Sequence, residues 1–328
     1  MPFFQPRVPA LSASIDLAGK TAIVTGATAG IGLEICRQYL ISKLSNLVVP
    51  ARNLSKGERV KQALLSDPAV KAANPTATIK VIQLDTETYS SAQRFATDFK
   101  AEFSDLHLLI LNAGIGTHEK EMSRTGHEKD MQVNFLSNVL LTLALLPTLE
   151  ATADKTGKPT RVTWTGSRVY MQTSLADESP SQGMLKYIDN TNLPMLKRYA
   201  NSKALCLFFQ IELAKQYKPD RVIINSFCPG LVHTGMTDGL PIYLRIPMAV
   251  LNHLKARAPE KAGWIALNAS VLVGAESHGR LMEDMDIGEP SDFVKGKEGQ
   301  RLQKLLWNEV VDEMAGVIDI PAWMTKVL

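Results

Sequence analysis

Tyr199 and Lys203 place a phenol and an ammonium group four residues apart in the sequence. If this stretch is helical, the two side chains are neighbours on one helical face. A positive charge beside a phenol favours the phenolate and lowers its pKa from about 10. Such a pair is suited to general acid and base catalysis on a carbonyl group. The same spacing also occurs on ordinary solvated helices, so the other motifs decide between the two interpretations.

A glycine-rich turn follows the first apolar run of the chain. The segment Thr25 to Gly32 lies between that run and an apolar-periodic stretch typical of a helix. Glycines at such a turn let backbone amides and a helix N-terminus approach a pyrophosphate, whose charge the helix dipole favours. The placement indicates a dinucleotide site rather than a plain tight turn. The residues assigned to it are Gly26, Thr28, Gly30, Ile31 and Gly32.

The end of the second apolar run indicates which dinucleotide binds. A site that prefers NAD normally offers an acid to the ribose hydroxyls there, whereas this chain has Arg52 and Asn53. The guanidinium of Arg52 is suited to pair with a 2′-phosphate, which favours NADP(H) over NAD(H). A solvated surface arginine is the alternative.

The residues that follow the third and fourth apolar runs are also expected to border the cofactor. Asp85 and Thr86 follow the third run. The carboxylate of Asp85 would accept from an adenine amino group while capping the next helix, and helix capping alone is the alternative. The fourth run ends in three small residues, which would let the chain pass beneath the adenosine ribose or would simply form a turn. They are Asn112, Ala113 and Gly114.

With Ser167 added, these motifs stand in the order found in the classical short-chain dehydrogenase/reductase family, which the chain resembles over residues 19–282. It is most similar to the NADP-dependent, retinol dehydrogenase-like carbonyl reductases of fungi and animals. The resemblance implies that Tyr199 donates a proton to the carbonyl oxygen and that hydride comes from the nicotinamide C4. Lys203 would acidify the phenol and bind the nicotinamide ribose.

The same resemblance assigns the other two members of a catalytic set. Ser167 would hold the carbonyl oxygen by a hydrogen bond, and Asn134 would position a water that links Lys203 to solvent. Taken singly, Ser167 is also an ordinary strand-end serine and Asn134 an ordinary helix-interior hydrogen-bonding residue.

The resemblance further implies that the segment after the sixth run binds the nicotinamide carboxamide. Its expected contacts are Pro229, Gly230, Val232 and Thr234. His233 receives no role, because a lone histidine is more often structural. The chain departs from the family at Gly166, where a second serine is usual, and at Ser137, where glycine is frequent. Neither departure removes a reacting group.

Short apolar runs alternate with helical patterns along the chain. Such runs are typical of parallel strands that helices bury on both faces. The expected fold is therefore an α/β doubly wound parallel sheet, a Rossmann fold, in a single domain. The expected strands are Thr21 to Val24, Asn46 to Pro50, Ile79 to Leu84, Leu106 to Leu111, Arg161 to Trp164 and Arg221 to Phe227.

The two ends of the chain differ from this pattern. Residues 1–18 lack the apolar stretch of a secretory signal and are expected to be a loose leader before the domain at 19–282. Residues 283–328 begin with acidic turns and continue with apolar residues at helical spacing. This extension is expected to pack on the core, with an interface helix as the alternative. Its apolar residues are Leu302, Leu305, Leu306, Val310 and Met314.

Two long segments, 168–198 and 231–262, are expected to border the open side of the cofactor cleft. An apolar lining there favours a bulky uncharged carbonyl or alcohol substrate, although the same residues would also serve as ordinary packing. The apolar stretch 240–254 leaves peripheral membrane contact open. The lining residues are Tyr170, Met171, Met184, Leu185, Tyr187, Met236, Leu240, Ile242, Tyr243, Leu244, Ile246 and Met248.

Bulk composition narrows the choice of partners and location. The 328 residues carry a formal net charge of +3 without a basic run, which does not indicate nucleic acid or an anionic membrane. The stretch 139–149 is too short to span a bilayer and is expected to be a buried core helix. Cys36, Cys206 and Cys228 show no metal-ligand spacing and are expected to be buried, reduced thiols in the cytoplasm. Relatives often form homodimers or homotetramers.

The leading functional hypothesis is an NADPH-dependent carbonyl reductase that runs as an alcohol dehydrogenase when the cofactor ratio favours oxidation. One alternative is an NADP-binding regulatory protein on the same scaffold, against which the intact catalytic set argues. Another is a non-redox tailoring enzyme, such as a cyclase or dehydratase. Product formation without net NADPH consumption would distinguish that alternative.

Overall fold

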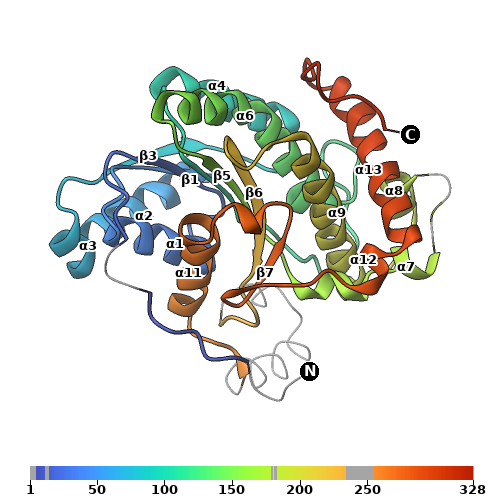
Figure 1. Ribbon diagram of the computed structural model, residues 1–328, viewed down its shortest axis with the longest axis horizontal. Helices are drawn as coiled ribbons and strands as arrows, with labels where there is room; N and C mark the ends of the chain where they lie inside the picture. Colours follow the sequence, from blue (N-terminus) through green and yellow to red (C-terminus); the bar gives the residue numbers. More distant parts are fainter. Residues whose placement is uncertain (1–4, 12–14, 179, 181–182, 234–254, 328) are drawn as a thin grey trace.

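The computed structural model describes residues 5–11, 15–178, 180, 183–233 and 255–327. Within these residues the strands form a sheet in the order β3-β2-β1-β4-β5-β6-β7-β8, parallel except for β8 (Figure 1). The strand order reverses between β1 and β4, which makes the fold a doubly wound Rossmann fold. The strands are β1 (Thr21–Val24), β2 (Asn46–Ala51), β3 (Thr78–Gln83), β4 (Leu108–Leu111), β5 (Thr160–Thr165), β6 (Val222–Cys228), β7 (Leu281–Glu283) and β8 (Asp286–Ile287).

The six expected apolar runs form β1 to β6, so the expected fold class is confirmed. The strands β7 and β8 were not expected. They form an antiparallel pair, joined at Asp284, in a segment whose acidic residues and glycine predicted only turns. The expected boundary between residues 282 and 283 therefore falls within β7.

Helices cover both faces of the sheet. On one face lie α1 (Gly30–Ile41), α2 (Leu54–Ser66), α3 (Pro68–Ala73), α11 (Pro259–Leu267) and the π-helical turn η4 (Asn268–Leu272). On the other lie α4 (Tyr89–Glu102), α5 (Lys129–Met131), the π-helical turn η1 (Gln132–Leu136), α6 (Ser137–Thr156), α9 (Met195–Gln216) and α13 (Lys297–Ala315) (Figure 1). The shorter helices are η2 (Arg168–Gln172), α7 (Leu175–Glu178), α8 (Met184–Asn190), η5 (Ala275–Ser277) and α12 (Asp292–Lys295).

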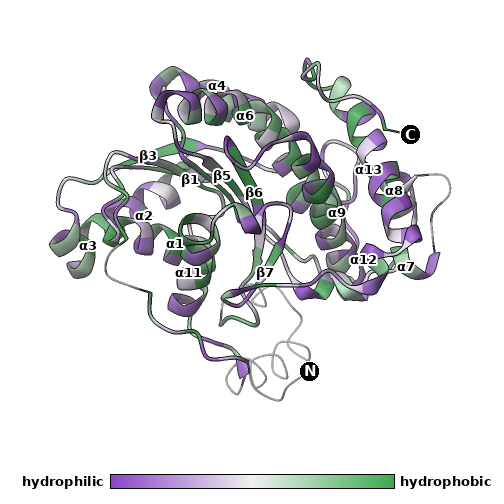
Figure 2. Cartoon of the chain, viewed as in Figure 1, coloured by the Kyte–Doolittle hydropathy of each residue, from purple (hydrophilic) through white to green (hydrophobic). Residues whose placement is uncertain are grey.

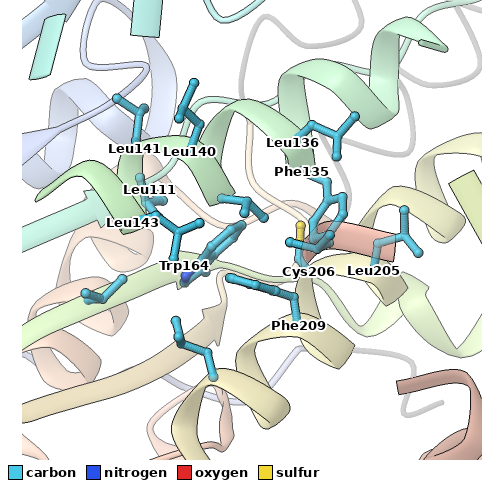
Figure 3. Close-up of a cluster of buried hydrophobic side chains, with 14 of the residues drawn as sticks. Leu111, Phe135, Leu136, Leu140, Leu141, Leu143, Trp164, Leu205, Cys206 and Phe209 are labelled. Carbon is cyan, nitrogen blue, oxygen red and sulfur yellow. The ribbon is translucent and has the colours of Figure 1, made fainter. Parts of the chain in front are cut away.

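An aromatic group in the core connects the elements that carry the expected catalytic residues. Trp164 on β5 and Phe135 in η1 both pack against Phe209 on α9, with ring centroids 6.1 and 6.0 Å apart (Figure 3). Trp307 of α13 stacks on Phe209 at 5.8 Å. Such pairs contribute about 0.5–1.5 kcal/mol each beyond the area they bury. This packing holds β5, η1, α9 and the C-terminal helix in fixed relative positions.

The continuous helix from Lys129 to Thr156 is long and apolar enough to cross a membrane by composition alone. In the molecule, 72% of its apolar window is buried, against α4 and the sheet. Figure 2 shows apolar residues along the central strands and polar residues on the outer helix surfaces. The helix is therefore a core helix, as expected for residues 139–149.

The described part of the N-terminal leader is not loose. Val8 is buried in the core cluster beneath α1 and α11, and Gln5 forms side-chain hydrogen bonds with Leu231 and Lys255. These contacts join the beginning of the chain to residues more than 200 positions away. Sequence composition gave no signal for them, because they depend on one polar side chain.

Candidate active site

Helix α9 carries Tyr199 and Lys203 on the same face, one turn apart. The Nζ atom of Lys203 lies 5.6 Å from the centroid of the Tyr199 ring, within the range of a cation–π contact. It also donates a 2.8 Å hydrogen bond to the carbonyl oxygen of Thr165, at the C-terminal end of β5. Lys203 is buried and Tyr199 is half-buried. The ammonium group is thus held between the phenol ring and the strand end.

Asn134 lies in η1, where a π-helical turn interrupts the long helix. Its Oδ1 accepts from the amide of Ile115 at 2.7 Å, and its Nδ2 donates to the carbonyl of Ile115 at 2.9 Å and to Ser202 Oγ at 2.9 Å. Its backbone carbonyl accepts from Cys206 Sγ and Asn138 Nδ2. π-Helical turns inside α-helices are frequent at functional sites. Here the side chain of Asn134 fixes the loop after β4 to α9.

The backbone from Gly114 to Gly116 passes along three of the expected catalytic residues. A Cβ atom added to Gly114 would lie 3.3 Å from Asn134 Oδ1 and 3.7 Å from Lys203 Nζ. A Cβ atom added to Gly116 would lie 3.6 Å from Cδ2 of Tyr199. The structure therefore brings Asn134, Tyr199 and Lys203 together along one loop.

Ser167 follows β5 and is the N-cap residue of η2. Its Oγ accepts from the amide of Val169 at 3.2 Å, which leaves the hydroxyl hydrogen able to donate to a ligand. Ser167 and Lys203 line the same small internal cavity, together with Gly166 and Tyr170. Ser167 thus performs the ordinary capping function and also shares a cavity with Lys203.

Sequence analysis assigned no role to two residues of α9 that position this set. Asn201 Oδ1 accepts from Thr173 Oγ1 at 2.8 Å and from the amide of Ser174 at 2.9 Å, which ties the end of η2 to α9. Ser202 Oγ donates to the carbonyl of Tyr199 at 2.8 Å and accepts from Asn134. Both residues lie between Tyr199 and Lys203 and are buried, but their contacts with Asn134, Thr173 and Ser174 are distant in sequence.

Thr25 is a third positioning residue, and no sequence motif indicated its role. Its Oγ1 accepts from the amides of Asn112 and Ala113 at 2.9 Å each, so it joins the ends of β1 and β4. The side chain of Asn112 extends this link, since Nδ2 donates to Thr25 O at 3.0 Å and Oδ1 accepts from Thr165 Oγ1 at 3.1 Å. Three neighbouring strands are thereby connected at their carboxyl ends.

A buried charged cluster lies beside Tyr199. The guanidinium of Arg198 donates to the carbonyls of Leu193, Thr117 and His118, and its Nε lies 3.4 Å from Oε1 of Glu128. Burial, together with the nearby Asp130 carboxyl, raises the pKa of Glu128 to about 7. Arg198 therefore fixes the loop after β4 to the beginning of α9.

The glycine turn has the geometry of an anion-binding turn. Gly26 and Gly30 have φ values of +66° and +55°, which only glycine adopts without strain. A Cβ atom at Gly32 would overlap the carbonyl oxygen of Gly26. Helix α1 begins at Gly30, and its N-cap residue, Ala29, has no side chain that could accept from the first amides. These amides suit a pyrophosphate, with Thr28 and Ile31 in the same turn.

Directly after β2, Arg52 is exposed and forms a 3.3 Å ion pair with Glu87. The same Oε1 atom of Glu87 also lies 3.2 Å from Lys129 Nζ. Asn53 is the N-cap residue of α2, where its Oδ1 accepts from the amide of Lys56 at 2.8 Å. The basic side chain expected after the second strand is therefore present as Arg52, but it is paired with the carboxylate of Glu87.

Asp85 does not cap α4, whose N-cap residue is Thr88. Its carboxylate accepts from the amide of Glu87 at 3.1 Å and pairs with Arg124 at 3.2 Å. Thr86 contributes its carbonyl oxygen to a hydrogen bond from Ser137. The capping alternative for Asp85 is therefore wrong.

The segment after β6 contains the other expected cofactor contacts. Gly230 has a φ of +74°, and Val232 forms an isolated parallel bridge with Arg257. Pro229 is buried and precedes this turn. Thr234 lies outside the described residues, as do the expected apolar residues from Met236 to Met248.

Comparison with known proteins identifies the family. The model of the short chain dehydrogenase family matches residues 20–168. The short-chain dehydrogenase/reductase tropG of Talaromyces stipitatus is 43% identical over 97% of this chain and 98% of its own length. The chain belongs to the short-chain dehydrogenase/reductase family. This membership makes it an oxidoreductase.

Solved structures of short-chain dehydrogenase/reductase folds agree with the topology. The complex of RhlG from Pseudomonas aeruginosa with NADP has a TM-score of 0.63 at 24% identity, covering 84% of this chain and 98% of RhlG. L-Sorbose reductase from Gluconobacter frateurii, solved with NADPH and L-sorbose, has a TM-score of 0.62 at 17% identity, covering 84% of this chain and 99% of that enzyme. At these identities the likeness shows the fold.

The structure explains both departures from the pattern of the short-chain dehydrogenase/reductase family. A Cβ atom at Gly166 would lie 2.8 Å from Cδ1 of Leu281 on β7, so the usual serine would require the Leu281 side chain to shift. Ser137 Oγ donates to the carbonyl of Thr86 at 2.7 Å and accepts from Gln132. Each departure matches a contact made within this chain.

Two residues expected to border the substrate cleft of this short-chain dehydrogenase/reductase pack under the C-terminal extension instead. Met184 and Leu185 are buried in the cluster that includes α13, and Met184 donates its amide to Glu309 of that helix. Tyr170 is also buried, and its hydroxyl accepts from the amide of Ser291. Met171 is 47% exposed. The expectation was wrong for Met184 and Leu185, because the C-terminal extension covers them, whereas Tyr170 lines the small cavity that Ser167 and Lys203 share.

Proposed function

We propose that this short-chain dehydrogenase/reductase uses NADPH to reduce a ketone or aldehyde of a bulky apolar substrate, or oxidises the corresponding alcohol. The observation that carries this proposal is the convergence of Asn134, Tyr199 and Lys203 on the loop Gly114–Gly116. Ser167 lines a cavity with Lys203, and the glycine turn opens at the same edge of the sheet. The proposed proton donor, Tyr199, and the glycine turn that would bind the pyrophosphate therefore lie at the same edge of the sheet.

In the reductive direction, bound NADPH supplies a hydride to the carbonyl carbon. The hydroxyl of Ser167 donates a hydrogen bond to the carbonyl oxygen, and the phenol of Tyr199 gives that oxygen a proton. The phenolate that remains is stabilised by the Lys203 ammonium, which lies over the ring. Asn134 keeps the loop beside Tyr199 in place through both backbone groups of Ile115.

The residues of this chain suit NADP(H) at several points. The amides at the beginning of α1 would hold the pyrophosphate, Arg52 the 2′-phosphate, and the Val232 backbone the nicotinamide carboxamide. The proteins of similar fold that were solved with NADP or NADPH support this choice of cofactor. Arg52 would exchange its pairing with Glu87 for the phosphate.

The apolar substrate class rests on the composition of the segment 231–262 and on the exposed side chain of Met171. The segment 240–254 carries Arg245 as its only Lys, Arg, Asp or Glu, which disfavours an anionic substrate held by several cations. The buried, free cysteines among the described residues are consistent with a reducing compartment such as the cytoplasm.

The test measures NADPH and NADH consumption, with product analysis, over a panel of bulky apolar ketones. We expect turnover with NADPH that disappears in Tyr199→Phe while NADPH still binds. Tyr217→Phe is the matched control, because Tyr217 lies at the far end of α9 against Trp323. Full turnover by Tyr199→Phe would contradict the proposal, and product formed without NADPH consumption would favour a non-redox activity.

A further inference from the structure

Gln5 makes three hydrogen bonds to the chain on either side of residues 234–254. Its Nε2 donates to the carbonyl of Leu231 at 2.8 Å and to the carbonyl of Lys255 at 2.7 Å. Its Oε1 accepts from the amide of Leu231 at 2.9 Å. The side-chain amide thus satisfies both backbone groups of Leu231, as a neighbouring strand would.

The turn at Gly230 is shaped to receive this side chain. Gly230 has a φ of +74°, and a Cβ atom there would overlap Oε1 of Gln5. Any other residue at position 230 would therefore be strained and would also displace the glutamine. Glycine at 230 and glutamine at 5 fit each other.

The same backbone is held from a second side by residues near Arg257. The amide of Arg257 donates to Leu231 O at 2.9 Å, and the amide of His233 donates to Arg257 O at 3.1 Å. The guanidinium of Arg257 lies 2.6 Å from the carboxylate of Asp284, and both side chains are largely buried. Leu231 therefore lies between Arg257, which is fixed to the β7–β8 turn, and Gln5 of the leader.

We propose that Gln5 is a positioning residue for the nicotinamide half of the cofactor. The inference rests on the proposed function, in which the backbone around Val232 contacts the carboxamide. Gln5 holds Leu231, and through it Gly230 and Val232, in the binding conformation before the cofactor arrives. A preorganised segment binds more tightly because the ligand does not have to order it.

The Gln5 side-chain amide both donates and accepts hydrogen bonds, so two substitutions at this position can be compared. Gln5→Ala removes all three hydrogen bonds. Gln5→Glu keeps an acceptor for the Leu231 amide but places a carboxylate against the carbonyls of Leu231 and Lys255, which repel it. We therefore expect Gln5→Glu to impair the site at least as much as Gln5→Ala.

The test compares binding of NADPH with binding of adenosine 2′,5′-bisphosphate, which lacks the nicotinamide half. Dissociation constants of the full-length protein are measured by fluorescence titration or calorimetry, so no substrate is required. We expect both variants to bind NADPH about tenfold more weakly, because the cofactor must then order the segment around Leu231, and the bisphosphate unchanged. Gln62→Ala, on the exposed face of α2, is the matched control.

Unchanged NADPH affinity in Gln5→Ala overturns the inference. Equal weakening of both ligands also overturns it, because that pattern indicates a general loss of structure rather than a local one. The native protein is measured first: if it binds neither ligand, the proposed function fails before any variant is compared. If it binds both, the variants test Gln5 alone.

Discussion

Arg52 has two alternative partners, the carboxylate of Glu87 and the proposed 2′-phosphate of the cofactor. Its guanidinium is 72% exposed, and Glu87, its partner at 3.3 Å, is also held by Lys129. A bound 2′-phosphate would have to compete with that carboxylate. This competition gives the two residues opposite expected effects on cofactor preference.

Arg52→Gln should raise the KM for NADPH by roughly ten- to a hundredfold, as expected for loss of a charge-assisted contact, and leave the KM for NADH nearly unchanged. Glu87→Gln should lower the KM for NADPH, because it removes the competing carboxylate. Steady-state kinetics with both cofactors measure the two effects. A uniform change with NADPH and NADH would show that Arg52 does not contact the phosphate.

Gly166 is a second residue with a testable local constraint. Gly166→Ser places a Cβ atom 2.8 Å from Leu281 Cδ1, and overpacking of this kind costs about 1–3 kcal/mol of unfolding free energy. Leu281→Val removes the clashing atom. In urea unfolding, the double variant should be more stable than the sum of the two single effects predicts. Strict additivity would mean that Leu281 is not the obstacle.

At the scale of elements, His127 connects three segments. Its Nδ1 lies 2.9 Å from Asp189 at the end of α8, and its Nε2 lies 3.1 Å from Glu313 on α13. Burial alone would lower the pKa of His127, but the hydrogen bonds to the two carboxylates outweigh it and raise the pKa to about 9. The charged imidazole therefore ties the loop before α5 to α8 and to the C-terminal helix.

A raised folded-state pKa makes stability dependent on pH in one direction. The contribution of His127 is fully present below pH 6.5, the value for the unfolded chain, and is lost as pH rises through about 9. The loss should be at most about 3.5 kcal/mol, at about 1.4 kcal/mol per pKa unit. Urea unfolding between pH 6 and 10 measures it, and His127→Gln and Asp189→Asn should both flatten the profile. A decline of equal steepness in His127→Gln would assign it to other groups.

Most elements could be predicted from the sequence because their signals are local. The strands β1 to β6 are apolar runs with helical periods between them, and the glycine turn follows directly from Gly26, Gly30 and Gly32. The strands β7 and β8 are too short to show a period, and their pairing depends on contact with β6. Local patterning therefore predicts the middle of the sheet better than its edge.

In the candidate site, the residues proposed to react could be predicted from the sequence, whereas the residues that hold them in position could not. Tyr199 and Lys203 are related by helical spacing, which can be seen in the sequence. Asn201, Ser202 and Thr25 each have partners on other elements, so only the folded chain shows these contacts. The burial of Met184 under α13 was missed for the same reason.

At the scale of the whole molecule, the site lies where the carboxyl ends of neighbouring strands meet, as expected for a doubly wound sheet. Contributions come from the leader, from the loops after β4 and β5, from α9 and from the segment after β6. The C-terminal helix α13 packs against α9, where Trp307 stacks on Phe209. The geometry of the candidate site thus depends on segments from Gln5 to Trp307.

The contact between Gln5 and Leu231 spans 226 positions, which has a consequence for synthesis on the ribosome. At ~5–20 residues per second, the leader emerges roughly 10 to 45 seconds before its partner does. The glycine turn and its partner Asn112 are both available much earlier. A nascent chain can therefore form its glycine turn well before the proposed nicotinamide end of the cleft, which requires residues as late as Lys255.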